Sequence, residues 1–530
     1  MRICAFFLLP WIGLAAGRPL EIDALVDQAR GAPAEFAADA LIRIAALPGV
    51  DKPRKVELLS EAFGQAAGAR QPYKRRSLAM DLGGAPRFYL QLDNRIYSQD
   101  LDALSLQLRA VEALLPLDAR KARDLFSRIP PLTLPRLTCE DYLVYDVSRF
   151  YEVLLGVTRN GFTPEEVAKG RPTLMLAQYA AAIASPSQIG PAARLVASAG
   201  LNDADFQKLL VPLAGALRRI SDDSRSFMEA RDAGAAILAL AEDCERRRIS
   251  PLILADAYRV YVVNNLSGIR CAGGPSASDA NDFVRFFNER LVTPPLRPIE
   301  EREAAPSKVE GKASLPRRCE DAECRAMAAR YRDLLLSPSG EGWSAEGKST
   351  PEWKGRLEDF FSAMEAWQPS SGLPAADFFR EKSGFYIDLF GLLQGQAGRE
   401  SAARAAFRFL EASRFRAETL AEWFLPVNVL IGRARLDPLG LGWLAAELER
   451  SSDPVIALYA RLEKIAPRPI QEILPLLSGP GTPGPYSTSA KPRFMCRKKS
   501  PPAIKMASPY AAAIPRSAAA GGTESIRMAR

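Results

Sequence analysis

The chain has 530 residues and no histidine, and its 70 Lys and Arg residues against 62 Asp and Glu residues give a net charge of +8. The missing imidazole excludes Ser-His-Asp and Cys-His catalysis, HExxH metal sites and histidine-ligated haem. A composition of 48% hydrophobic and 25% charged residues is typical of a globular protein. Catalysis would therefore have to use carboxylates, a Ser-Lys pair or an oxygen-ligated metal.

The N-terminus has the pattern of a secretory signal. Arg2 precedes the apolar stretch 3–14, and the small residues 15–17 follow it. That stretch is shorter than the roughly 18 residues of a membrane helix, so we expect residues 1–17 to be a cleaved signal peptide and the protein to be exported, periplasmic or extracellular. The alternatives are a buried N-terminal helix or a retained anchor. No later run is long and apolar enough to predict a transmembrane segment.

Six of the seven cysteines follow this segment and are disulfide candidates in an exported protein. Cys244 ends one helical pattern and Cys271 follows the next, so an antiparallel hairpin would bring the two together. Cys319 and Cys324 are close in sequence and can pair only if Cys319 lies outside the helical turn. The alternative is that some remain buried thiols. With no CxxC motif and no histidine, we expect neither a metal nor a cofactor.

The hydrophobic pattern along the chain is mainly helical. Only residues 88–92 alternate like a strand, whereas residues 206–220 and the segments after Cys324 and Trp353 repeat with a helical period. Several helix starts combine a capping residue with a proline at the first helical position, and Glu166 adds a capping box to one of them. These starts are Thr163-Pro164, Ser250-Pro251, Thr350-Pro351, Asp437-Pro438 and Asp453-Pro454. We expect about eighteen helices in all.

This succession of helices predicts an all-α fold of stacked helical hairpins, an α-solenoid or superhelix similar to tetratricopeptide proteins. No fixed repeat period is present, so the pattern is weaker than a tetratricopeptide consensus. Residues 294–318 are polar, contain prolines and lack periodicity, which predicts an interdomain linker or a long surface loop. The linker would separate an N-terminal helical domain, residues 18–293, from a C-terminal helical domain, residues 319–478.

The last segment, residues 479–530, is rich in Pro, Ser, Gly and Ala and has no apolar stripe, so we expect a disordered tail. It contains nine basic residues and one acidic residue, which accounts for the whole net charge of +8. Residues 1–478 are therefore electrically balanced. The charge gives no reason to expect a nucleic-acid partner for the folded part.

The segment around Glu400 is a candidate for catalysis. The pair Glu400-Ser401 is similar to that of lytic transglycosylases, which use a single glutamate as general acid and carry a Gly-Leu-Met-Gln motif downstream of it. Here the comparable stretch 391–394 lies upstream. Glu400 also fits an early turn of a helix, so it is a weak catalytic candidate.

The sequence favours an exported helical-repeat protein that acts as a non-catalytic binding or scaffolding module, with a protein or cell-envelope partner. The alternative is a carbohydrate-active enzyme, a glycoside hydrolase or a protein similar to lytic transglycosylases, with a carboxylate general acid. A glycosidase requires a cleft with two carboxyl groups roughly 5–9.5 Å apart. The ligand and the oligomeric state are left open by the sequence.

Overall fold

The computed structural model describes most of the chain between residues 19 and 469. The described residues are 19–77, 94–137, 143–221, 226–227, 231–266, 269–272, 276–300, 302–303, 308–312, 321–340, 342–344, 346–393, 396–436 and 438–469. The expected signal peptide, the expected strand at 88–92 and the expected tail at 479–530 lie outside them. All the described residues belong to one compact unit.

The described chain is mainly helical, with 21 helices including one short 3-10 helix, so the all-α prediction is confirmed. The first group of helices comprises α1 (Pro19–Arg30), α2 (Ala34–Ala45), α3 (Lys52–Ala66), α5 (Ala103–Leu114), α6 (Ala119–Phe126), α7 (Ser148–Asn160), α8 (Pro164–Ala168), α9 (Arg171–Ala181), α10 (Pro186–Ser198), α11 (Asp203–Arg219), α13 (Arg231–Arg246), α14 (Leu252–Leu266) and α15 (Ser276–Arg290). The second comprises α16 (Ala322–Leu335), η1 (Gly347–Ser349), α17 (Pro351–Ala366), α18 (Ala375–Leu392), α19 (Gln396–Glu411), α20 (Leu420–Leu436), α21 (Pro438–Glu449) and α22 (Pro454–Ile465).

The predicted helix starts are explained by local hydrogen bonds. Thr163 and Glu166 form the expected capping box, in which Thr163 Oγ1 accepts from the Glu166 backbone N–H and the Glu166 carboxylate accepts from the Thr163 backbone N–H. The side chains of Thr350 and Asp453 cap α17 and α22 in the same N-terminal position. Helix α21 begins at Pro438, and α14 begins directly after Pro251.

Four short strands form two small sheets. Strand β1 (Arg75–Ser77) pairs antiparallel with β2 (Leu143–Tyr145), and β3 (Ile269–Ala272) pairs parallel with β4 (Lys308–Lys312). Strand β4 lies inside the stretch 294–318, where the sequence predicts a linker or a long surface loop, and those five residues are a regular element that the sequence did not predict. The backbone ladder to β3 defines this strand, and its sequence lacks the apolar alternation by which strands are recognised.

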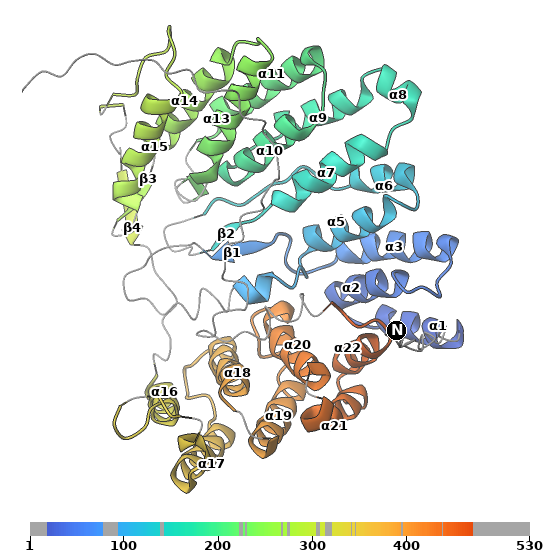
Figure 1. Cartoon of the computed structure of the whole chain (residues 1–530), viewed down its shortest axis with the longest axis vertical. Coiled ribbons are helices and arrows are strands. Elements are labelled where there is room, and N and C mark those ends of the chain that lie inside the picture. The colour runs from blue at the N-terminus through green and yellow to red at the C-terminus, as the bar shows by residue number, and fades with distance from the viewer. Residues whose placement is uncertain are drawn as a thin grey trace, which may run out of the picture. The chain divides into compact units, whose positions relative to one another are not determined.

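Most helices contact helices that lie one to three elements away in the chain. In the first group, α2 contacts α1 and α3, α5 contacts α3 and α6, and α10 contacts both α7 and α13. The second group continues in the same manner through α18, α19, α20, α21 and α22. Figure 1 shows these successive helices lying side by side.

The first and last helices of the unit meet. Helix α22 contacts α1 and α2, as Figure 1 also shows. Phe36 of α2 packs against Trp423, Phe424 and Tyr459 of α20 and α22, with ring centroids 6.1, 4.9 and 5.8 Å away. The predicted N-terminal and C-terminal helical domains therefore lie in one compact unit and share a hydrophobic core.

The cysteine prediction needs one correction. Cys244 is a free thiol that is fully buried near the end of α13, so the expected disulfide with Cys271 is not formed. Cys271 follows α14, as expected, and lies in β3 in register with Glu310 of β4. Cys324 is buried in the first turn of α16, and Cys319 lies outside the described residues. The pairing of Cys319 with Cys324 stays a prediction.

Among the helices of the described chain, none has both the length and the apolar character needed to cross a bilayer.

Candidate functional site

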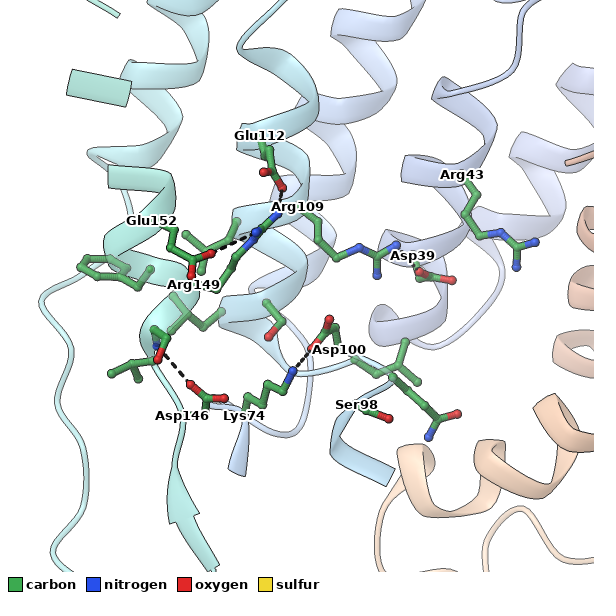
Figure 2. A pocket seen from close by; sticks show the side chains of 18 of the residues that line it. Asp39, Arg43, Lys74, Ser98, Asp100, Arg109, Glu112, Asp146, Arg149 and Glu152 are labelled. Atoms are coloured by element: carbon green, nitrogen blue, oxygen red, sulfur yellow. Dashed lines mark hydrogen bonds and ion pairs between the residues drawn. The ribbon is translucent and has the colours of Figure 1, made fainter. Parts of the chain in front are cut away.

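A cavity of about 730 Å³ lies where α2, α5 and α7 approach α20 and α22. Figure 2 shows it from close by. Its walls carry five basic and five acidic side chains together with uncharged polar and apolar ones. The charged residues are Asp39, Arg43, Lys74, Asp100, Arg109, Glu112, Asp146, Arg149, Glu152 and Arg468.

Helices α2 and α5 present charged residues on faces that are otherwise apolar. Asp39 lies between Ala38 and Ala40, both fully buried, and is itself only 7% exposed. Arg109 on α5 binds Asp39, with 2.7 Å between Nη2 of the arginine and Oδ1 of the aspartate. This ion pair lets both helices pack closely while placing a carboxylate and a guanidinium at the cavity wall.

The environment of Asp39 favours its charged form. Burial alone would raise its pKa, but the charges of Arg109 and Arg43 and a hydrogen bond from Tyr459 outweigh burial and lower it. The Tyr459 hydroxyl donates to Asp39 Oδ2 over 2.6 Å. Burial and the adjacent Asp39 charge in turn raise the pKa of Tyr459. The carboxylate of Asp39 is thus a fixed negative charge with a partner on each oxygen.

Behind this wall, Glu463 of α22 binds three arginines. Its carboxylate lies 3.1 Å from Arg43, 2.8 Å from Arg435 and 2.9 Å from Arg468. The Glu463 side chain is 5% exposed, and burial would raise its pKa, but the charges of Arg468 and Arg43 lower it. This cluster holds α2, α20 and the residues after α22 together beside the cavity.

The short sheet positions another pair of charges. The backbone N–H of Asp146 donates to the carbonyl of Lys74 over 3.0 Å, at the end of the β1–β2 ladder. Lys74 Nζ then binds Asp100 Oδ1 at 2.7 Å. Burial opposes the charge on Lys74, but Asp100 and Asp146 outweigh it and raise its pKa. Asp100 has a φ of 53°, a left-handed conformation that aspartate adopts more readily than most residues.

A third group joins α5 to α7. Arg149 of α7 binds Glu112 of α5 and, at 3.0 Å, Glu152 one turn further along its own helix. Burial alone would lower the pKa of Arg149, but hydrogen bonds from its guanidinium to the two glutamates outweigh burial and raise the pKa. All three side chains are about half exposed, and Figure 2 shows them pointing toward one another between α5 and α7.

An amide pair links the loop before α5 to α20. Gln99 Nε2 donates to the carbonyl oxygens of Ala421, over 2.7 Å, and Ile96, over 3.1 Å. Asn428 Nδ2 donates to Gln99 Oε1 over 2.6 Å. Because Gln99 and Asn428 both line the cavity, the C-terminal helices contribute polar groups to it as well as the apolar ring of Phe424.

The catalytic candidate from the sequence lies elsewhere. Glu400 is in the first turns of α19, half-buried, and is not among the residues that line the cavity. None of the residues that line the cavity was predicted as a site residue from the sequence. A sequence signal for such residues does exist, namely a single charged residue within an apolar run, as at Asp39 or Arg109. A charge in that position will be buried and therefore requires a partner from another element.

Among the described carboxyl groups near the cavity, Asp102 has the environment closest to that of a general acid, since burial raises its pKa to about 6. Its carboxylate accepts from the Ser105 backbone N–H over 2.9 Å and caps α5. Asp102 does not line the cavity. In the described part of the chain, no group of three or more Asp, Glu or Cys side chains is placed to hold a metal ion.

The fold and the cavity define an all-α protein with a charged cavity. No protein-family model matches the chain, and comparisons with curated proteins and with solved structures give no significant match.

Proposed function

We propose that the chain is an exported binding protein whose ligand is a small polar molecule held in the charged cavity. Export rests on the signal-peptide pattern of residues 1–17. We further propose that the helices are stacked hairpins of a superhelical array, since α10 contacts α7 and α13 while α11 contacts α9 and α14, as expected when alternate helices stack. The observation that carries the binding function is the cavity itself, with five basic and five acidic side chains on its walls.

The size and the composition of the cavity suit a small ligand. A volume of about 730 Å³ falls within the range of small-molecule sites. Equal numbers of basic and acidic side chains favour a ligand that is polar but has little net charge. The charged groups are already positioned by ion pairs such as Arg109–Asp39 and Lys74–Asp100. A site fixed in this way loses little conformational entropy when the ligand binds.

The alternative, a carbohydrate-active enzyme, is less well supported by the same residues. A glycosidase requires a carboxylic acid whose pKa is raised so that it can protonate the leaving group. In the cavity the pKa of Asp39 is lowered, and Asp100, Glu112 and Glu152 each bind a lysine or arginine. The contacts of Asp39 stabilise its carboxylate and disfavour proton donation from it. Hydrolysis of a polysaccharide or of peptidoglycan by the purified chain would nevertheless establish the enzyme.

The binding function is tested with the full chain by thermal unfolding and calorimetry against amino acids, short peptides, small sugars and nucleotides. We expect one of these classes to raise the melting temperature and to bind saturably. The variant Arg149→Gln should weaken that binding, because Arg149 faces the cavity and its side chain is 53% exposed, so the substitution disturbs little packing.

The matched control is Arg285→Gln. Arg285 is 65% exposed, binds Asp282 at 2.6 Å on α15, and does not line the cavity. It should bind the ligand as tightly as the unmodified chain does. If no class of compound binds at millimolar concentration, or if Arg149→Gln binds as well as the control, the cavity is not the binding site and the proposal fails.

A further inference from the structure

The charges of the cavity are unevenly distributed between its two sides. On one side, Arg109 binds Asp39 and the charge of Arg43 acts on the same carboxylate. Arg468, which also lines the cavity, shares Glu463 with Arg43, so the lining residues on this side are three arginines and one aspartate, an excess of two positive charges. On the other side there are two cations and four carboxylates. Lys74 lies with Asp100 and Asp146, and Arg149 binds Glu112 and Glu152. Figure 2 shows Asp39 and Arg43 lying apart from Glu112, Arg149 and Glu152.

The excess of two positive charges on this side is unchanged when Glu463 and Arg435, which lie behind the cavity wall, are counted as well. Arg43 and Arg468 both bind Glu463, which adds one negative charge, but Arg435 binds the same carboxylate and adds one positive charge. The cavity therefore has a positive side next to α2 and α22 and a negative side next to α7 and the β1–β2 sheet. The charges of the lining residues sum to zero, but the positive and the negative charges are concentrated on opposite sides of the cavity.

A ligand with separated charges fits this arrangement best. Removing an ammonium or a carboxylate group from water is costly unless an opposite charge replaces the hydration, and the two sides of the cavity supply such charges. A neutral sugar has no charge to match to either side. A single free amino acid is small for about 730 Å³, whereas a short peptide has an ammonium group and a carboxylate at its two ends.

We propose that the cavity binds a short peptide with both ends free, the carboxylate facing the arginines beside Asp39 and the ammonium facing the glutamates beside Arg149. The inference rests on the proposed binding function and specifies its ligand. Between the two ends, Asn428 Oδ1 has no hydrogen-bond partner, and the hydroxyl oxygens of Ser98 and Ser148 line the cavity and can accept from peptide N–H groups.

The test is calorimetry of the full chain with trialanine. We expect saturable binding that weakens as salt is added, because attraction between charges is screened. N-acetyl-trialanine amide has the same length without the terminal charges and should bind at least roughly tenfold more weakly, the loss of about 1.4 kcal/mol or more. Equal binding of the two peptides overturns the inference, because the terminal charges would then contribute nothing.

The protein side of the contact is tested with Glu152→Gln. Glu152 is 62% exposed and binds Arg149 three residues earlier on the same helix. Glu57→Gln is a matched control, since Glu57 is 59% exposed, binds Arg54 three residues earlier on α3 and does not line the cavity. We expect Glu152→Gln to weaken trialanine binding by about threefold to fivefold and the control to leave it unchanged. Equal binding by both variants contradicts the inference.

The two proposals fail in different ways. If trialanine does not bind but chitotriose or another uncharged sugar does, and Arg149→Gln weakens that binding, the cavity is a binding site and the peptide inference is wrong. If nothing binds, both are wrong. Circular dichroism and thermal unfolding of each variant confirm that it is folded before binding is measured.

Discussion

Tyr459 of α22 donates a hydrogen bond of 2.6 Å to the carboxylate of Asp39 on α2, although 420 residues separate them in the sequence. The other oxygen of Asp39 accepts from Arg109 of α5 at 2.7 Å. One buried carboxylate therefore connects helices from the beginning and the end of the compact unit. This contact also forms part of the wall of the cavity.

We predict that Tyr459→Phe lowers the free energy of unfolding by about 1.5–3 kcal/mol, the usual contribution of a hydrogen bond to a charged group. The substitution removes only the hydroxyl and keeps the ring that packs on Phe36. Urea unfolding measures the difference.

The control is Tyr258→Phe. Tyr258 is also fully buried, but its hydroxyl has no hydrogen-bond partner, so its removal should cost less than about 0.5 kcal/mol or should stabilise the protein. Equal losses for the two variants would mean that the bond to Asp39 contributes nothing.

A second prediction concerns the carboxylate that binds three arginines. Glu463→Gln leaves Arg43, Arg435 and Arg468 without a charged partner on α22, and we expect it to destabilise the protein by about 3–5 kcal/mol. Chemical denaturation provides the measurement.

Glu449→Gln is the comparison for this variant. Glu449 binds Lys464 at 3.1 Å, but the lysine side chain is 69% exposed, and an exposed pair contributes at most about 1 kcal/mol. A loss for Glu463→Gln as small as that of Glu449→Gln would show that the cluster does not hold the helices together.

A third prediction is the pH dependence due to Asp102. Burial raises its pKa in the folded protein to about 6 from the ordinary value of 3.8. Between these values the folded state binds more protons than the unfolded state, so the stability that Asp102 contributes at low pH is lost as pH rises through 6. Asparagine does not ionise and still offers an oxygen to the Ser105 N–H.

We therefore expect Asp102→Asn to become more stable than the unmodified protein between about pH 4 and 6, by about 2–3 kcal/mol, and the difference to level off above that range. Urea unfolding at several pH values follows it. Asp118 caps α6 through the Lys121 N–H but is exposed, so Asp118→Asn should show a much smaller change. If the difference in free energy of unfolding between Asp102→Asn and the unmodified protein did not change with pH, the prediction would be wrong.

A fourth prediction concerns residues 479–530, which account for the net charge of +8. If the tail is disordered, its deletion leaves the melting temperature of the protein essentially unchanged, because a disordered segment buries no apolar surface. Calorimetric scans of the full chain and of the truncated chain decide this. A fall of many degrees would show that the tail packs on the folded unit.

Much of the helical structure could be predicted because its causes are local. The capping box at Thr163 and Glu166 and the prolines at the first helical positions act within one turn, so they are visible in the sequence. The helical period of residues 206–220 likewise predicted α11. Strand β4 could not be predicted, since it is defined by its ladder to β3 at a distance in sequence.

The sequence by itself determined the all-α class, most helix starts and the absence of imidazole chemistry, because composition, periodicity and capping are properties of short segments. Only the tertiary structure brought Tyr459 to Asp39, left Cys244 a free thiol and gathered ten charged residues around one cavity. The physical reason is that a buried charge is stabilised by partners from other helices. Which partners these are depends on how the whole chain packs.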